Sequence, residues 1–151
     1  MLFGFKSILA GLIVSAALFG CSYDPGYIGQ ESDTVPVALY ITNSTTDQSV
    51  RCVVSMAHYI TFDLNVVRPD ESLDIDLLRG VSSSTLYFKK SSTRLMAVEN
   101  VICGTHANWS ETKRHVELSV LRSTAQTELT VHCTYLAEAL TCQIKNDTTD
   151  N

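Results

Sequence analysis

The stretch TELTVHCTYLAEALTCQIK, residues 127–145, constrains the fold of this chain more than any other segment. If the stretch folds back about residues 137–138, Cys133 lies opposite Cys142 in an antiparallel pair, at a Cα separation that a disulfide accepts. The same register places four apolar residues on the face of the two cysteines. These residues are Val131, Tyr135, Leu140 and Ile144. The pattern predicts a β-hairpin closed by a Cys133–Cys142 disulfide.

A short helix across Leu136–Leu140 is the competing interpretation of the same stretch. The letters YLAEAL are good helix formers, and Ala-Glu is a poor pair for a tight hairpin turn. We prefer the hairpin.

Alternation of apolar and polar residues continues along the rest of the chain. Leu73, Ile75 and Leu77 fall on one face of a segment whose other face carries Ser72, Asp74 and Asp76, which is typical of a half-buried strand. The other expected strands are 35–42, 50–58, 59–67, 86–88, 95–103 and 115–121. Many short strands without a persuasive helix predict an all-β domain, a small antiparallel β-sandwich or, alternatively, a small β-barrel.

The chain begins with Lys6 followed by the apolar run Ser7–Phe19, which is too short for a transmembrane helix and typical of a secretory signal peptide. The run ends in Leu18-Phe19-Gly20-Cys21, which resembles the lipobox of bacterial lipoproteins. This resemblance implies cleavage before Cys21, a diacylglycerol on its thiol and acylation of its amine. With Ser22 next, it also implies sorting to the outer membrane of a Gram-negative bacterium, with the domain in the periplasm.

With Cys21 assigned to the lipid, four cysteines remain for an exported domain, which suggests two disulfides among three possible pairings. The hairpin register pairs Cys133 with Cys142. Cys52 and Cys103 are then left to pair, and their bond would tie an early strand to a middle one.

We therefore expect a signal peptide at 1–20, a lipidated flexible tether at 21–34, the β-domain at 35–145 and a disordered tail at 146–151. Residues 34–145 carry 11 acidic and 10 basic side chains. This balance lacks the density of Lys and Arg that neutralising phosphates requires, so nucleic acid is not an expected partner.

The residues that could perform chemistry form no recognisable motif. The histidines do not stand at metal-ligand or protease spacings; they are His58, His106, His115 and His132. Asp74 and Asp76 share a strand face, but two carboxylates are too few for calcium. The sequence thus predicts no metal site, no cofactor and no enzymatic activity.

The loop Gly104–Glu111 holds the single Trp of the chain directly after Cys103. His106 and Trp109 are candidate contacts for a protein partner, because Trp often carries binding energy at interfaces. The alternative is that Trp109 folds back to cap the core.

These features favour a non-enzymatic adaptor of a cell-envelope assembly, held to the membrane through the lipid on Cys21. The layout is similar to that of small lipoproteins of secretion systems, such as pilotins. The alternative is a lipid-anchored inhibitor of a periplasmic hydrolase such as lysozyme.

Overall fold

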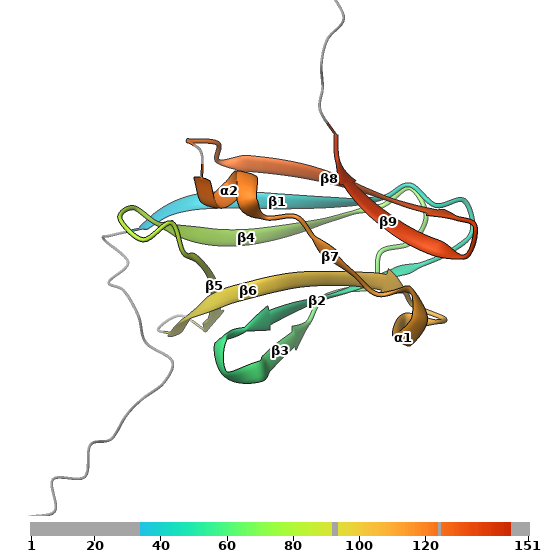
Figure 1. Cartoon of the computed structure of the whole chain (residues 1–151), viewed down its shortest axis with the longest axis horizontal. Coiled ribbons are helices and arrows are strands. Elements are labelled where there is room, and N and C mark those ends of the chain that lie inside the picture. The colour runs from blue at the N-terminus through green and yellow to red at the C-terminus, as the bar shows by residue number, and fades with distance from the viewer. Residues whose placement is uncertain (1–33, 92–93, 124, 146–151) are drawn as a thin grey trace, which may run out of the picture.

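The computed structural model describes residues 34–91, 94–123 and 125–145, and most of these residues lie in strands (Figure 1). The predicted signal peptide, Cys21 and all but the last residue of the 21–34 tether, as well as the 146–151 tail, lie outside the described residues. The strands are β1 (Thr34–Asn43), β2 (Val50–Met56), β3 (Ile60–Asp63), β4 (Ser72–Gly80), β5 (Leu86–Ser91), β6 (Arg94–Thr105), β7 (Arg114–Val116), β8 (Glu128–Leu136) and β9 (Ala139–Ile144). The helical turns are η2 (Ala57–Tyr59), α1 (Trp109–Thr112) and α2 (Ser119–Ser123).

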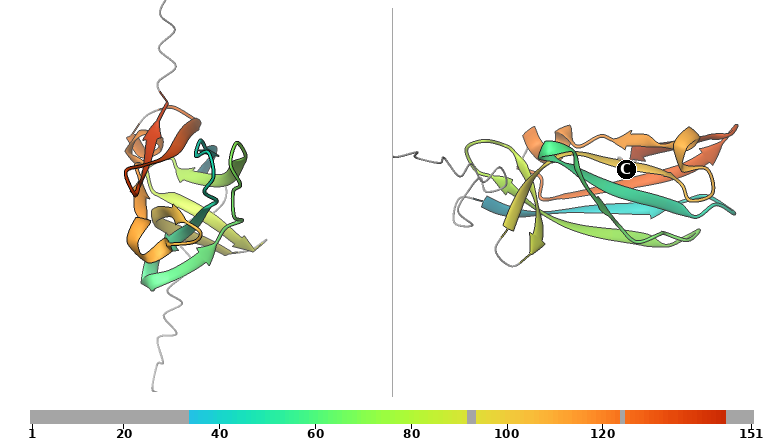
Figure 2. Two further views of the ribbon diagram at one scale, coloured as in Figure 1. Left: turned by 90° about the vertical axis from the view of Figure 1, so that its right-hand side faces the viewer. Right: turned by 90° about the horizontal axis from the view of Figure 1, so that it is seen from below.

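Hydrogen bonding runs through one sheet in the order β3-β2-β6-β5-β4-β1-β8-β9, with β7 added to β6. The sheet folds over into two layers, one containing β8, β1 and β4 and the other β6, β2 and β3 (Figure 1; end view in Figure 2). Strand β6 joins them, because its first part pairs with β5 and its later part with β2. The predicted all-β domain with two disulfides is confirmed.

One strand pair is not antiparallel. Strand β8 lies parallel to β1, with Leu39 beside Leu129 and Ile41 beside Val131. The chain reaches β8 through α2 after leaving β7 in the other layer, so β8 enters the sheet in the direction of β1. A hairpin connection could not produce this pairing, since parallel strands need a crossover.

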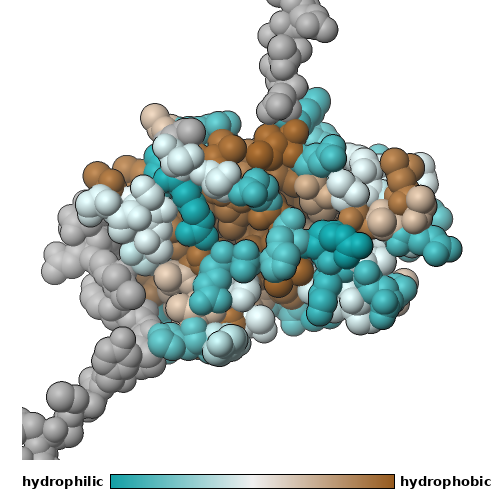
Figure 3. All heavy atoms as spheres, viewed as in Figure 1, coloured by the Kyte–Doolittle hydropathy of each residue, from teal (hydrophilic) through white to brown (hydrophobic). Residues whose placement is uncertain are grey.

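The core lies between the two layers and is made of the alternating residues that the sequence places on one face. Leu39 and Ile41 of β1 and Ile75 and Leu77 of β4 are at most 2% exposed, and Leu39 pairs with Ile75. Burying each such side chain contributes about 1.5–3 kcal/mol. In the orientation of Figure 3, apolar residues show through the middle of the face, with polar residues around them.

The C-terminal hairpin has the predicted register. Cys133 pairs with Cys142, Val131 with Ile144 and Tyr135 with Leu140. The helix alternative for 136–140 is wrong, because the chain turns there between two strands.

The turn of this hairpin suggests a stabilising substitution. Ala137 and Glu138 both have positive φ, of 49° and 65°, where a Cβ is unfavourable. Replacing them by Asn and Gly, the residues preferred in such turns, should raise the free energy of unfolding by about 1 kcal/mol. Urea unfolding measures the change. As a control, Thr141→Gly in the exposed face of β9 should lower stability by about 0.5–1 kcal/mol. A loss of stability in the turn variant would contradict the assignment.

Three predicted strands are shorter than expected. The segment 50–58 is strand only to Met56, because the turn η2 begins at Ala57. The segment 59–67 forms a strand only over Ile60–Asp63. The strand cannot begin earlier because His58 and Tyr59 have positive φ. After Asp63 the chain separates from β2, and it pairs with β2 again only at the isolated Val50–Val67 bridge. The segment 115–121 is strand only to Val116.

A helical turn replaces the second half of the segment 115–121. The carboxylate of Glu117 accepts a 2.8 Å hydrogen bond from the Ser119 amide at the start of α2. This bond lowers the pKa of Glu117. Leu118 and Leu121, three positions apart, are then both buried.

Helix α2 connects the two layers through two arginines. Arg79 of β4 donates hydrogen bonds to the carbonyls of Leu121 and Gln126, each at 2.8 Å. Arg122 of α2 donates to the carbonyls of Val98 and Glu99 in β6. Since both arginines bond to backbone carbonyls, they fix the crossover that brings β8 beside β1.

Candidate functional site

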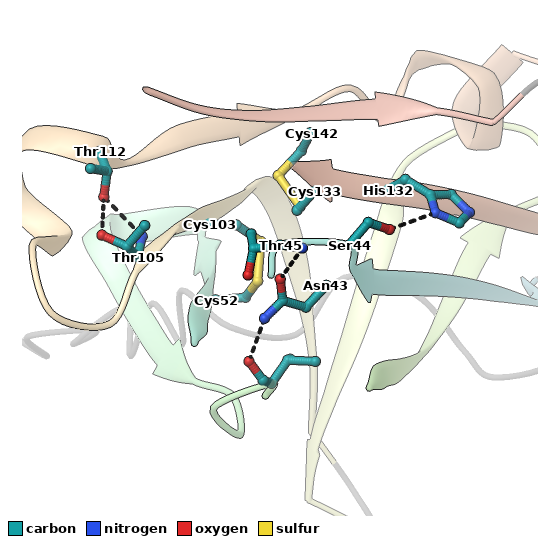
Figure 4. Close-up of a disulfide and its surroundings, with 11 residues drawn as sticks. Asn43, Ser44, Thr45, Cys52, Cys103, Thr105, Thr112, His132, Cys133 and Cys142 are labelled. Atoms are coloured by element: carbon teal, nitrogen blue, oxygen red, sulfur yellow. Dashed lines mark hydrogen bonds between the residues drawn. A yellow bond between two sulfur atoms is a disulfide. The ribbon is translucent and has the colours of Figure 1, made fainter. Parts of the chain in front are cut away.

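The two disulfides lie next to each other in the core (Figure 4). Cys52–Cys103 joins β2 to β6, and Cys133–Cys142 joins β8 to β9, as the sequence predicts. The sulfur atoms of Cys103, Cys133 and Cys142 lie within 4.8 Å of one another. Among the described residues, this is the one group of three or more His, Cys, Asp or Glu side chains close enough to share an ion. All three sulfur atoms are already bonded in disulfides, so none of them is a thiolate that could bind a metal ion.

Asn43 organises the loops at one end of the domain, a role that the sequence analysis missed. Its side-chain amide is fully buried and donates to the carbonyls of Gln48 at 2.8 Å and Val67 at 2.9 Å. Its Oδ1 accepts a 3.0 Å bond from the amide of Thr45 (Figure 4). Asn directly after an alternating strand and before Ser-Thr is an Asx-turn signal that could have revealed this role.

Trp109 lies on the outer face of the β2–β6 pair, half-buried and neither in the core nor fully exposed. Its ring packs on Gly104, where an added Cβ would come within 2.8 Å of the ring. The guanidinium of Arg51 lies 5.2 Å from the ring centroid, a cation–π contact, and Arg51 also forms an ion pair with Asp63. The alternative in which Trp109 caps the core is therefore wrong.

The loop that carries Trp109 is held at its base by two buried threonines. The Oγ1 of Thr112 accepts a 2.8 Å bond from the amide of Thr105 and donates to the carbonyl of Asn108 (Figure 4 shows the Thr105–Thr112 contact). His106 is exposed, and its amide donates to the carbonyl of Ser49. This anchoring leaves the side chain of His106 exposed to solvent. The contact of His106 and Trp109 with a protein partner stays a prediction.

The predicted polar residues do not come together in one catalytic group. His132 lies 3.0 Å from the hydroxyl of Ser44, and both residues are at least partly exposed (Figure 4). Among the described residues, no carboxylate is hydrogen-bonded to this histidine. Asp74 and Asp76 project from the outer face of β4 into solvent, as predicted.

A cleft of about 580 Å³ opens between the edges of β3 and β4, and the sequence analysis did not anticipate it. Apolar side chains from three strands line it, including Phe62, Ile75 and Phe88. Phe62 and Phe88 meet with their ring centroids 5.1 Å apart. Asp74 and Asp76 stand at the rim. In Figure 2 (right), β4 runs along the lower border of the domain.

A second depression, of about 460 Å³, lies on the outer face of the same layer. Its floor includes the small residues Pro36 and Ala38 of β1, and Asp76 and Lys89 line both this depression and the cleft. The two hollows therefore adjoin around the exposed edge of β4. Within the described part of the chain, no helix is long and apolar enough to cross a bilayer.

Comparison with known proteins gives little that bears on function. No protein-family model matches the chain, and no curated protein matches it. Among solved structures, the chain is similar to one described as "NMR structure of the protein from Eubacterium rectale". The similarity covers 81% of this chain and 99% of that chain, with 13% sequence identity and a TM-score of 0.45.

Proposed function

We propose that this protein is a lipid-anchored, non-enzymatic binding module of a cell-envelope assembly, in the outer membrane of a Gram-negative bacterium. The observation that carries the proposal is the pair of disulfides buried side by side in the core. Disulfides persist in oxidising compartments such as the bacterial periplasm, and all four of these cysteines follow the lipobox-like segment that ends at Cys21.

A lipid anchor at Cys21 would place the β-domain within one tether length of the membrane surface. Stable attachment takes more than one acyl chain, which a diacylglycerol together with an acylated amine supplies. The domain itself offers a binding surface in the apolar cleft between β3 and β4 and in the anchored loop that carries Trp109. These surfaces support binding of a protein partner.

The lipid anchor is tested by replacing one atom. Cys21→Ser should move the protein from the membrane fraction into the soluble periplasmic fraction, because the thiol that accepts the diacylglycerol is lost. Fractionation followed by immunoblotting measures the shift, and Ser22→Thr serves as a control that should stay in the membrane. Retention of the Cys21→Ser protein in the membrane would contradict the anchor.

Affinity purification of a C-terminally tagged protein from detergent-solubilised membranes tests the binding role. A stoichiometric set of envelope proteins, identified by mass spectrometry, is the expected result. Recovery of one soluble hydrolase would instead favour an inhibitor, and recovery of the bare lipoprotein would contradict the proposal.

A further inference from the structure

We propose that the free edge of β4 binds an extended segment of a partner protein, which adds to the sheet as a strand with alternating basic and apolar side chains. This proposal deepens the binding role proposed above by naming the surface and the chemistry of the partner. It rests on three features of the cleft between β3 and β4: unpaired backbone groups, an apolar lining and an acidic rim.

The backbone of β4 is only partly covered on the side that faces the cleft. The amide of Gly80 bonds to the carbonyl of Thr85, so the even-numbered residues of β4 direct their backbone groups toward β5. Of the residues of β4, only 77–79 pair with β5. The same register directs the carbonyl of Asp76 toward the amide of Lys89, so in the described chain the edge positions that no strand pairs with are Ser72 and Asp74.

Unpaired edge groups of this kind are templates for strand addition. The uncovered stretch, residues 72–75, is about four residues long, enough for a short added strand. In an added strand, alternate side chains would point to opposite sides of the sheet. Those pointing inward would lie beside Leu73, which is half-buried, and over Phe62, which is 38% exposed. The inward positions therefore require apolar side chains.

The outward positions of the added strand would lie beside Asp74 and next to Asp76, which already has Lys89 of β5 beside it. Both side chains are exposed, and neither forms an ion pair within the described chain. The third acid of the cleft, Asp63, is already paired with Arg51. Opposite charges on neighbouring strands are favourable and like charges are unfavourable. The outward positions therefore favour Lys or Arg.

The same charges disfavour a second copy of this chain as the occupant. If two β4 edges paired with each other, the aspartates of one copy would lie next to those of the other. Acidic side chains on an open edge thus oppose self-pairing, while they attract a basic strand.

The test uses the synthetic peptide Lys-Val-Arg-Ile-Lys-Val, labelled with a fluorophore, and the mature lipoprotein purified in a non-ionic detergent. Anisotropy measures the Kd, and amide hydrogen exchange locates the site. We expect saturable binding with a Kd below about 1 mM and slower exchange at residues 72–76. A peptide with Glu in place of Lys and Arg should not bind. N-methylation of the amides that would face β4 should weaken binding by about tenfold.

Variants that remove a negative charge show whether peptide binding depends on the two aspartates of the cleft rim or on the overall negative charge of the protein. The double variant Asp74→Asn, Asp76→Asn should weaken peptide binding by about fivefold, while its urea midpoint stays unchanged. Asp47→Asn, an exposed acid in the β1–β2 connection, is the matched control and should bind as the parent does.

Several results would overturn the proposal. These are the absence of binding, equal binding by the N-methylated peptide, equal binding by the double variant, and protection located away from β4. Protection at β4 that grows with protein concentration without peptide would assign the edge to a second copy. If affinity purification recovers envelope partners equally with the double variant, the binding role stands and the β4 site fails.

Discussion

Replacing Cys52 and Cys103 together by alanine should lower the free energy of unfolding by about 4 kcal/mol, whereas replacing Cys133 and Cys142 should lower it by about 2.5 kcal/mol. The larger loss follows from the sequence separation, which is 51 residues for the first bond and 9 for the second. A disulfide that closes a longer loop removes more conformational entropy from the unfolded chain.

Urea denaturation of the two double variants and the parent, with m-values compared, measures the difference. Both pairs join directly opposed strand residues, and three of the four cysteines are fully buried while Cys142 is half-buried, so each variant is compared with the other for the loss of packing. Equal losses would show that packing of the sulfur atoms outweighs the chain-entropy effect. A larger loss for Cys133 and Cys142 would contradict the prediction.

Asn43→Ala should lower the free energy of unfolding by about 3 kcal/mol, an effect unusual for a polar residue near a loop. The substitution leaves the buried amide of Thr45 without its acceptor. It also removes one of the two hydrogen bonds that the carbonyls of Gln48 and Val67 each accept, since Gln48 keeps the bond from the Thr45 hydroxyl and Val67 the bond from the Val50 amide. Each buried group left unpaired costs about 1–3 kcal/mol. Urea unfolding provides the measurement.

Asn65→Ala is the matched control for Asn43→Ala. Asn65 lies in the segment between β3 and β4, and its side chain is exposed. Its replacement should change the stability by less than about 0.5 kcal/mol. If the two asparagine variants were equally stable, the role of Asn43 in joining the loops would be refuted.

The features that the sequence predicts well are those determined by neighbours in the chain. The register of β8 and β9 follows from residues at most 13 positions apart, because period-two alternation and one turn leave a single way to align Cys133 with Cys142. That bond then leaves one pairing for Cys52 and Cys103.

The features that the sequence does not predict depend on residues far apart in the chain. The parallel pairing of β1 with β8 depends on a crossover through α2, whose five residues have no strong helical pattern. The cleft exists because β5 pairs with only part of β4, and strand lengths are not visible in local alternation. Trp109 lies against Gly104 because that residue has no side chain, which a sequence pattern cannot reveal.

The close approach of the sulfur atoms of Cys103, Cys133 and Cys142 has a consequence for the order of oxidation. In the compact domain, Cys103 is near enough to Cys133 for thiol–disulfide exchange, so proximity in the folded state does not select the correct partner. The order of the cysteines along the chain selects the correct partner, since Cys103 is the next cysteine after Cys52 and Cys142 is the next after Cys133. Under the proposed export and lipidation of Cys21, Cys52 and Cys103 would be the first free thiols to emerge and could be joined before Cys133 arrives.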